Sequence, residues 1–203
     1  YILARTNRIL FDVSERLKKE GYVFWKEGAG WSISEEVVSS IEGWLKICKD
    51  QSLTVHQWVQ FSKRTKKGMI EHGGKRKIEQ LDPGNTYTLD DLLNSDLGSY
   101  LNLDKKMMWY DVLNITEAQR IYIIAARRRG EFILTKKPRI RISTIHKAKG
   151  GEADNVALIL DCPKIIKEKG DEDSEHRIFY VGATRARKTL HIVEPKDKNG
   201  YEL

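Results

Sequence analysis

Two short runs in the last third of the 203-residue chain combine charged, hydroxyl and glycine residues beside apolar segments. The first run spans residues 143–154 and the second spans residues 175–186. Ligands of open α/β sheets bind where strands meet loops or helices, so side chains at such positions are candidates for chemistry. The two runs therefore indicate a ligand-binding sheet whose loops carry both positive charge and a carboxylate.

The residue types in and around these runs suit a nucleoside triphosphate. Gly150 and Gly151 have no Cβ, so a ligand can approach their backbone closely. The carboxylate of Glu152 can accept a hydrogen bond from a ribose hydroxyl. Arg5 and Arg185 carry permanent charge in the planar form that pairs with phosphate. We expect Arg5, Arg185 and Glu152 to converge on one sheet edge, where they would stabilise a phosphoryl group in transfer.

The two ends of the chain have the pattern of alternating strands and helices. Short apolar runs predict strands, and apolar residues at helical spacing predict helices. The predicted strands and helices at the two ends are residues 1–4 (strand), 6–20 (helix, capped by Thr6 or Asn7), 22–25 (strand), 139–142 (strand), 156–160 (strand), 175–184 (helix) and 190–193 (strand). The continuous apolar run at 156–160 is typical of a buried parallel strand. The ends therefore predict one α/β sheet.

Helical patterns dominate the middle of the chain, which we expect to be a mostly helical insertion into that sheet. Ser32 and Glu35 have the spacing of a capping box, and Thr54 can cap the next helix. The predicted helices are residues 37–48, 55–61, 89–97 and 116–129. Between them, residues 63–77 form a loop-like stretch with seven Lys or Arg against one Glu.

The overall charge favours a polyanionic partner. The chain has 36 Lys and Arg against 29 Asp and Glu, a formal net charge of +7. Lys75, Arg76 and Lys77 are the candidates for phosphate contacts in the basic stretch, although a solvated surface is the alternative interpretation. No apolar run approaches the roughly 18 residues of a membrane span, so we expect no membrane partner.

Cysteine and histidine usage predicts neither a disulfide framework nor a metal site. Cys48 and Cys162 are too few and too far apart for a disulfide scaffold, which favours reduced thiols in a cytosol. The histidines are scattered without the spacing of zinc ligands, and we assign no metal-binding residue. Because Tyr1 lies inside an apolar run, we expect the chain to be a fragment of a larger protein.

Three segments together resemble a known family. ILARTN at residues 2–7, TIHKAKGGE at 144–152 and FYVGATRA at 179–186 resemble motifs IV, V and VI of superfamily 1 helicases of the UvrD/Rep/PcrA type. The resemblance implies the C-terminal RecA-like domain, an α/β fold of the P-loop NTPase type with a parallel sheet and flanking helices. Residues 1–31 and 138–203 would form this domain, and residues 32–137 a helical insertion similar to the family's 2B subdomain.

The resemblance also implies residue roles. Arg5 would contact the γ-phosphate of ATP, Arg185 would act as the arginine finger, and Glu152 would hold the ribose, with Gly150 and Gly151 beside the nucleotide. The residues implied for gripping single-stranded DNA are Thr144, His146, Lys147 and Lys149. The sequence departs from the family at Ala4, where members often have an aromatic that stacks on adenine, and at Gly151, where leucine is common.

The implied activity is that of an ATP-dependent DNA helicase or translocase, with 3′→5′ polarity and ATP with Mg²⁺ as cofactor. Its expected partners are single-stranded DNA or a single-strand/double-strand junction, and the N-terminal RecA-like domain of the same protein. A bacterial or phage-encoded cytoplasmic protein is expected. The sequence has no G-x-x-x-x-G-K-[ST] loop, so we expect Mg²⁺ ligands in the missing N-terminal domain and no activity from this fragment alone. The alternative is a helicase-like scaffold or DNA-binding module without ATPase activity.

Overall fold

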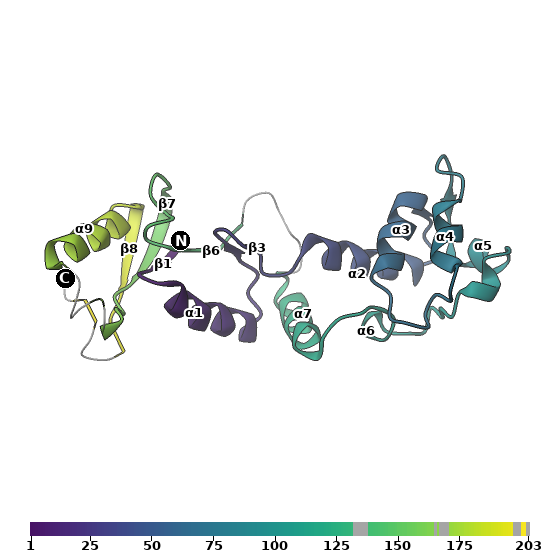
Figure 1. The fold of residues 1–203 in the computed structure, drawn as a ribbon, viewed down its shortest axis with the longest axis horizontal. Coiled ribbons are helices and arrows are strands. Elements are labelled where there is room, and N and C mark those ends of the chain that lie inside the picture. The colour runs from purple at the N-terminus through teal and green to yellow at the C-terminus, as the bar shows by residue number, and fades with distance from the viewer. Residues whose placement is uncertain (132–137, 165, 167–170, 197–199, 202–203) are drawn as a thin grey trace. The chain divides into compact units, whose positions relative to one another are not determined.

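The computed structural model describes residues 1–131, 138–164, 166, 171–196 and 200–201. The chain divides into two compact units (Figure 1). We call Tyr1–Ser32 with Tyr122–Leu203 the sheet unit, and Ile33–Ile121 the insertion unit. The boundary predicted at residue 137 lies outside the described residues.

The sheet unit is built on six strands, which confirms the predicted α/β class. They are β1 (Ile2–Ala4), β2 (Trp25–Lys26), β3 (Gly30–Trp31), β6 (Arg141–Thr144), β7 (Ala153–Ile159) and β8 (Ala186–Val193). Their order in the sheet is β3-β2-β6-β1-β7-β8. Every neighbouring pair is parallel except β2 and β3, which form an antiparallel hairpin. The β-α-β start and the late strands thus meet in one mostly parallel sheet.

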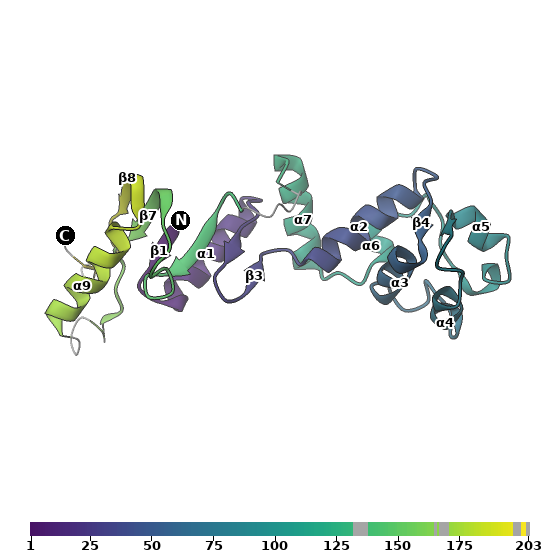
Figure 2. The same cartoon turned by 90° about the horizontal axis from the view of Figure 1, so that it is seen from above.

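Helices cover both faces of this sheet. Successive side chains of a strand point to opposite faces, so neighbouring residues of β1 pack against different helices. Leu3 packs with Phe179 of α9 (Glu172–Ala183) on one face. Ala4, the next residue of β1, packs with Leu10 of α1 (Asn7–Lys19) on the other. Figures 1 and 2 both show α9 beside β7 and β8. Asp171 caps α9, so the helix begins before the predicted residue 175.

The first crossover confirms the predicted cap and corrects the predicted second strand. Thr6 caps α1 by accepting a hydrogen bond from the backbone N–H of Ile9. Strand β2 is shorter than predicted, because the N–H of Phe24 donates to the Ser32 hydroxyl at 3.0 Å instead of to a neighbouring strand. Ser32 therefore has other partners and is not the expected helix cap, and Ser34 caps α2 (Glu35–Ile47) by accepting from the N–H of Val37.

The insertion unit is mostly helical, as the middle of the sequence predicts. Besides α2, its regular elements are β4 (Leu53–Thr54), α3 (Val55–Lys63), α4 (Gly74–Glu79), β5 (Thr86–Tyr87), α5 (Leu89–Leu93), a 3₁₀ turn η1 (Gly98–Tyr100), α6 (Trp109–Val112) and the start of α7 (Glu117–Arg129). Strands β4 and β5 pair antiparallel and were not expected. The core contains Trp44 stacked on Phe61 with ring centroids 5.8 Å apart.

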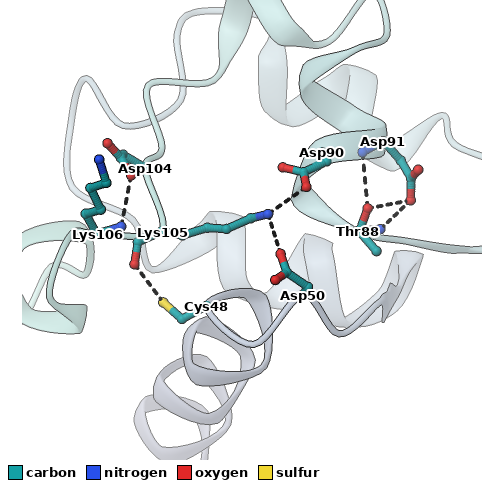
Figure 3. A network of polar contacts seen from close by, with 8 residues as sticks. All are labelled: Cys48, Asp50, Thr88, Asp90, Asp91, Asp104, Lys105 and Lys106. Carbon is teal, nitrogen blue, oxygen red and sulfur yellow. Dashed lines mark hydrogen bonds and ion pairs between the residues drawn. The ribbon is translucent and has the colours of Figure 1, made fainter.

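A polar network ties three segments of the insertion unit together (Figure 3). The Lys105 ammonium donates to Asp50, just after α2, and to Asp90 in α5. The carbonyl of Lys105 accepts from the Cys48 thiol at 3.4 Å. Helix α5 ends earlier than the predicted residue 97, because the Ser95 hydroxyl donates to the carbonyl of Leu92 and turns the chain.

No described helix is both long enough and apolar enough to cross a membrane.

Candidate nucleotide and DNA site

The direction of the strands places the backbones of the two candidate arginines at opposite edges of the sheet. An edge here means the line formed by one set of ends of the parallel strands. Arg5 follows Ala4, the last residue of β1, whereas Arg185 precedes Ala186, the first residue of β8. Strands β1, β7 and β8 run parallel, so the end of one and the start of another lie at opposite edges. The expectation that one edge carries Arg5, Arg185 and Glu152 is therefore wrong, and Glu152 lies at the Arg185 edge.

Helix α9 nevertheless contacts both guanidinium groups. Arg5 donates from Nε and Nη2 to the two carboxylate oxygens of Glu175, at 2.7 and 2.8 Å. Arg185 folds back along the helix and donates from Nε to the carbonyl of Val181 at 2.9 Å. Six residues separate Glu175 from Val181, which corresponds to about 9 Å along a helix axis.

Arg185 keeps an uncompensated positive charge. Its Nη2 donates to the Thr184 hydroxyl at 3.1 Å, and its Nη1 lies 3.5 Å from the carbonyl oxygen of Gly151. These acceptors and the Val181 carbonyl are all neutral, and Arg185 forms no ion pair with any residue that the structure describes. The contact with Gly151 places this charge beside the loop that carries Glu152. Both features suit an anionic ligand.

Arg5 has the opposite environment, because its charge is paired. The side chains of Arg5 and Glu175 are only 16% and 13% exposed. The hydrogen bonds that Arg5 donates to Glu175 raise the pKa of Arg5 above its usual value. Glu175 is not among the functional candidates that the sequence predicts, although it opens the run at 175–186. The sequence pattern gives no sign that an acid on α9 faces the end of β1.

Glu152 is exposed and lines a cleft of about 510 Å³ at the starts of the parallel strands. The cleft is also lined by Tyr1, whose ring lies 4.9 Å from the guanidinium carbon of Arg141. A Cβ on Gly151 would lie 3.0 Å from the Tyr1 hydroxyl, so the backbone passes Tyr1 where a side chain would be tight. Gly150 has a positive φ of 85°, which favours glycine. Both glycines thus shape the loop that presents Glu152.

The candidate DNA residues lie at the end of β6 and in the tight turn that follows it. Thr144 is buried, and its hydroxyl accepts from the backbone N–H of Lys147 at 3.4 Å, so it holds the turn. His146 and Lys149 are exposed, and with Arg177 of α9 they line a pocket of about 190 Å³. The apolar lining of this pocket is formed by Ile145, Ile178 and Val181. Lys147 extends to the β2–β3 turn, where its Nζ lies 3.0 Å from the position that a Cβ on Gly28 would take.

The basic candidates of the insertion unit lie on helix α4, not on a loop as predicted. Lys75, Arg76 and Lys77 form what we call the α4 cluster. Lys75 and Arg76 are exposed, and the Lys77 ammonium lies 4.7 Å from the centroid of the Tyr100 ring. The cluster therefore presents two unhindered cations and a third that is held against an aromatic ring.

The side chains present fit the phosphates and ribose of a nucleotide, which call for arginine, glycine and a carboxylate. They do not add a ligand set for a divalent cation. Among the residues that the structure describes, no three or more His, Cys, Asp or Glu side chains gather as metal ligands would.

Comparison with known proteins identifies the family of this chain. Residues 34–196 match the family described as the UvrD-like helicase C-terminal domain. The chain is also 33% identical over 103 residues to the ATP-dependent DNA helicase srs2 of Schizosaccharomyces pombe. That similarity covers 50% of this chain but only 11% of the yeast helicase, so the chain spans a small part of the relative's length. The chain belongs to the UvrD-like helicase C-terminal domain family.

Proposed function

We propose that the complete protein is an ATP-dependent DNA helicase that moves 3′→5′ along single-stranded DNA. In it, this chain would close onto ATP held by an N-terminal RecA-like domain. The observation that carries the proposal is the uncompensated charge of Arg185 beside the loop of Glu152. Family membership and the similarity to an ATP-dependent DNA helicase support it.

At the nucleotide, each candidate side chain has a distinct role. Glu152 accepts hydrogen bonds from the ribose, and Gly150 and Gly151 let the nucleotide approach the backbone. Arg5 contacts the γ-phosphate, and Arg185 is the arginine finger that stabilises the charge developing on the transferring phosphoryl group. Mg²⁺ bound with ATP would supply further positive charge, with its ligands outside this chain.

At the DNA, His146, Lys147 and Lys149 contact the single strand, and Thr144 holds their turn in shape. The α4 cluster contacts phosphates of the duplex at a single-strand/double-strand junction. Val181 belongs to both the candidate DNA site and the candidate nucleotide site. It lines the pocket of His146, and its carbonyl accepts a hydrogen bond from Arg185. A movement of α9 at the DNA would therefore reach the arginine finger.

We assign residues 1–31 and 138–203 to the RecA-like domain and residues 32–137 to a 2B-like insertion, whose residues 122–131 pack with the sheet unit. Closure of the RecA-like domain on ATP would alternate with opening after hydrolysis, and this cycle would move the DNA-gripping turn along the strand.

The test is the activity of the complete protein on defined DNA. We expect single-stranded DNA to stimulate ATP hydrolysis, and a duplex with a 3′ single-stranded tail to be unwound in preference to one with a 5′ tail. DNA binding without ATP hydrolysis would instead establish the scaffold alternative. Unwinding of the 5′-tailed duplex alone would overturn the polarity but keep the motor.

A further inference from the structure

The most tightly built contact among the candidate residues is the ion pair between Arg5 and Glu175. It joins residues 170 positions apart, from the end of β1 and the first turn of α9, through two hydrogen bonds of 2.7 and 2.8 Å. Charge-assisted bidentate pairs of this kind fix the plane of the guanidinium as well as its position. Glu175 therefore determines where the Arg5 side chain points.

The pairing leaves part of Arg5 available. Glu175 occupies the Nε–Nη2 side of the guanidinium, and no hydrogen bond from Nη1 to another described residue is present. The Nη1–Nη2 edge still has N–H groups that could donate to a second anion. One carboxylate can thus hold Arg5 while a phosphate binds the remaining edge.

We propose that Glu175 is the positioning residue of Arg5, holding its guanidinium with the Nη1–Nη2 edge ready for the γ-phosphate of ATP. This inference rests on the proposed function, because it requires Arg5 to meet a nucleotide. Glu175 and the Val181 carbonyl that holds Arg185 belong to the same helix. Helix α9 would accordingly fix both arginines as one rigid group.

A purely structural ion pair has different consequences, which allows a clear test. If Glu175 only stabilised the fold, its loss would lower the melting temperature and leave the turnover of folded protein unchanged. If it positions Arg5, its loss disturbs the alignment of a charge needed in the transition state. An error of about 1 Å in such alignment can cost on the order of 100-fold in rate.

The experiment uses the complete protein and measures ATP hydrolysis stimulated by single-stranded DNA. The variants are Glu175→Gln, Arg5→Ala and the two combined. The matched control is Glu172→Gln, the same change at a carboxylate of the same helix that is 91% exposed. All activities are measured well below the melting temperature of each variant.

We expect Glu175→Gln to lower kcat on the order of 10-fold to 100-fold, with little change in KM for ATP or in DNA affinity. The combined variant should be no slower than Arg5→Ala alone, because Glu175 acts only through Arg5. The control should match the wild type. If Glu175→Gln lowers the melting temperature, Glu175→Asp provides a second variant that keeps the charge, and its kcat should lie between those of wild type and Glu175→Gln.

Two results would overturn the inference alone: wild-type turnover of Glu175→Gln while Arg5→Ala is impaired, or additive losses in the combined variant. Wild-type turnover of Arg5→Ala would also overturn it, and would remove the γ-phosphate role of Arg5 while leaving the proposed helicase activity standing. A wild-type protein that binds DNA but hydrolyses no ATP would refute the proposed function itself and the inference with it.

Discussion

Tyr122 closes the sheet unit at the point where the chain leaves it and returns. Ser32 is the last residue of the unit's first segment, and Tyr122 is the first residue of its second. The Tyr122 hydroxyl lies 2.6 Å from the Ser32 hydroxyl and donates to the carbonyl of Tyr22 at 2.8 Å. The Tyr122 side chain is buried, with only 7% exposed. Replacing Tyr122 by Phe therefore removes two buried hydrogen bonds at this junction.

The expected magnitude follows from these contacts. Each net hydrogen bond contributes about 1 kcal/mol, and a buried acceptor left without a partner costs about 1–3 kcal/mol. We expect Tyr122→Phe to lower the free energy of unfolding by roughly 1–3 kcal/mol at pH 7. The measurement is urea denaturation, with hydrogen exchange of peptides from β1 and β6 assigning the loss to the sheet unit. Tyr180→Phe is the control, because Tyr180 is 70% exposed.

The same residue predicts a pH dependence. Burial raises the pKa of Tyr122 from 10.0 to about 12. Above pH 10 the unfolded chain loses this proton while the folded chain keeps it, so the stability from neutral Tyr122 is lost as the pH rises from about 10 to about 12. The loss stays below the limit of about 1.4 kcal/mol per pH unit, because both states are partly ionised in this range. Because Phe does not ionise, the stability gap between wild type and Tyr122→Phe should narrow by about 1 kcal/mol between pH 10 and pH 11. An unchanged midpoint at pH 7, or a constant gap in alkali, would refute this reasoning.

Three further predictions concern other parts of the chain. Gly21 has a φ of 75°, and a Cβ there would lie 2.7 Å from the carbonyl carbon of Ala125. Gly21→Ala should therefore lower the free energy of unfolding by roughly 2–4 kcal/mol, measured by thermal denaturation. Gly130→Ala should lower it by only about 1–2 kcal/mol, because there only the backbone conformation is unfavourable. Changing the α4 cluster to glutamates should reduce the slope of log K against log salt for duplex binding by up to roughly 0.9 per lost phosphate contact; an equal slope would leave the cluster as a solvated surface. Lys105→Met should speed hydrogen exchange in α2 and α5 of the insertion unit, because it removes the ammonium shared by two carboxylates. The control Lys106→Met should leave this exchange unchanged. Equal exchange rates in the two variants would contradict this role for the network.

Two of the helix caps were predictable from the sequence, because capping depends on residues that are close together in the chain. A strand followed by Thr6 at a helix start, and Thr54 three residues before Gln57, are local patterns that specify caps. The choice between Ser32 and Ser34 was not predictable, because it depends on Tyr122, which lies 90 residues along the chain from Ser32. Long-range partners decide which of two suitable side chains does the capping.

The geometry of the candidate site shows the same limit. The identities of Arg5, Glu152 and Arg185 follow from the motifs, but their arrangement depends on strand direction. A residue after one parallel strand and a residue before another lie at opposite edges, and the contacts that both guanidinium groups make with α9 depend on how this helix packs. Glu175 was missed for this reason, since its role depends on a contact between the two ends of the chain.

The most direct test of the account is the kcat of DNA-stimulated ATP hydrolysis by the complete protein with Arg185→Ala. The control is Arg16→Ala, which removes an arginine that is 76% exposed on α1. Arginine fingers contribute roughly 10³-fold to 10⁵-fold to turnover, so we expect a loss of about 10³-fold or more with DNA binding and melting temperature retained. If Arg185→Ala turned over ATP as fast as the wild type and the control, that result would contradict the assignment of Arg185 in this chain as the arginine finger.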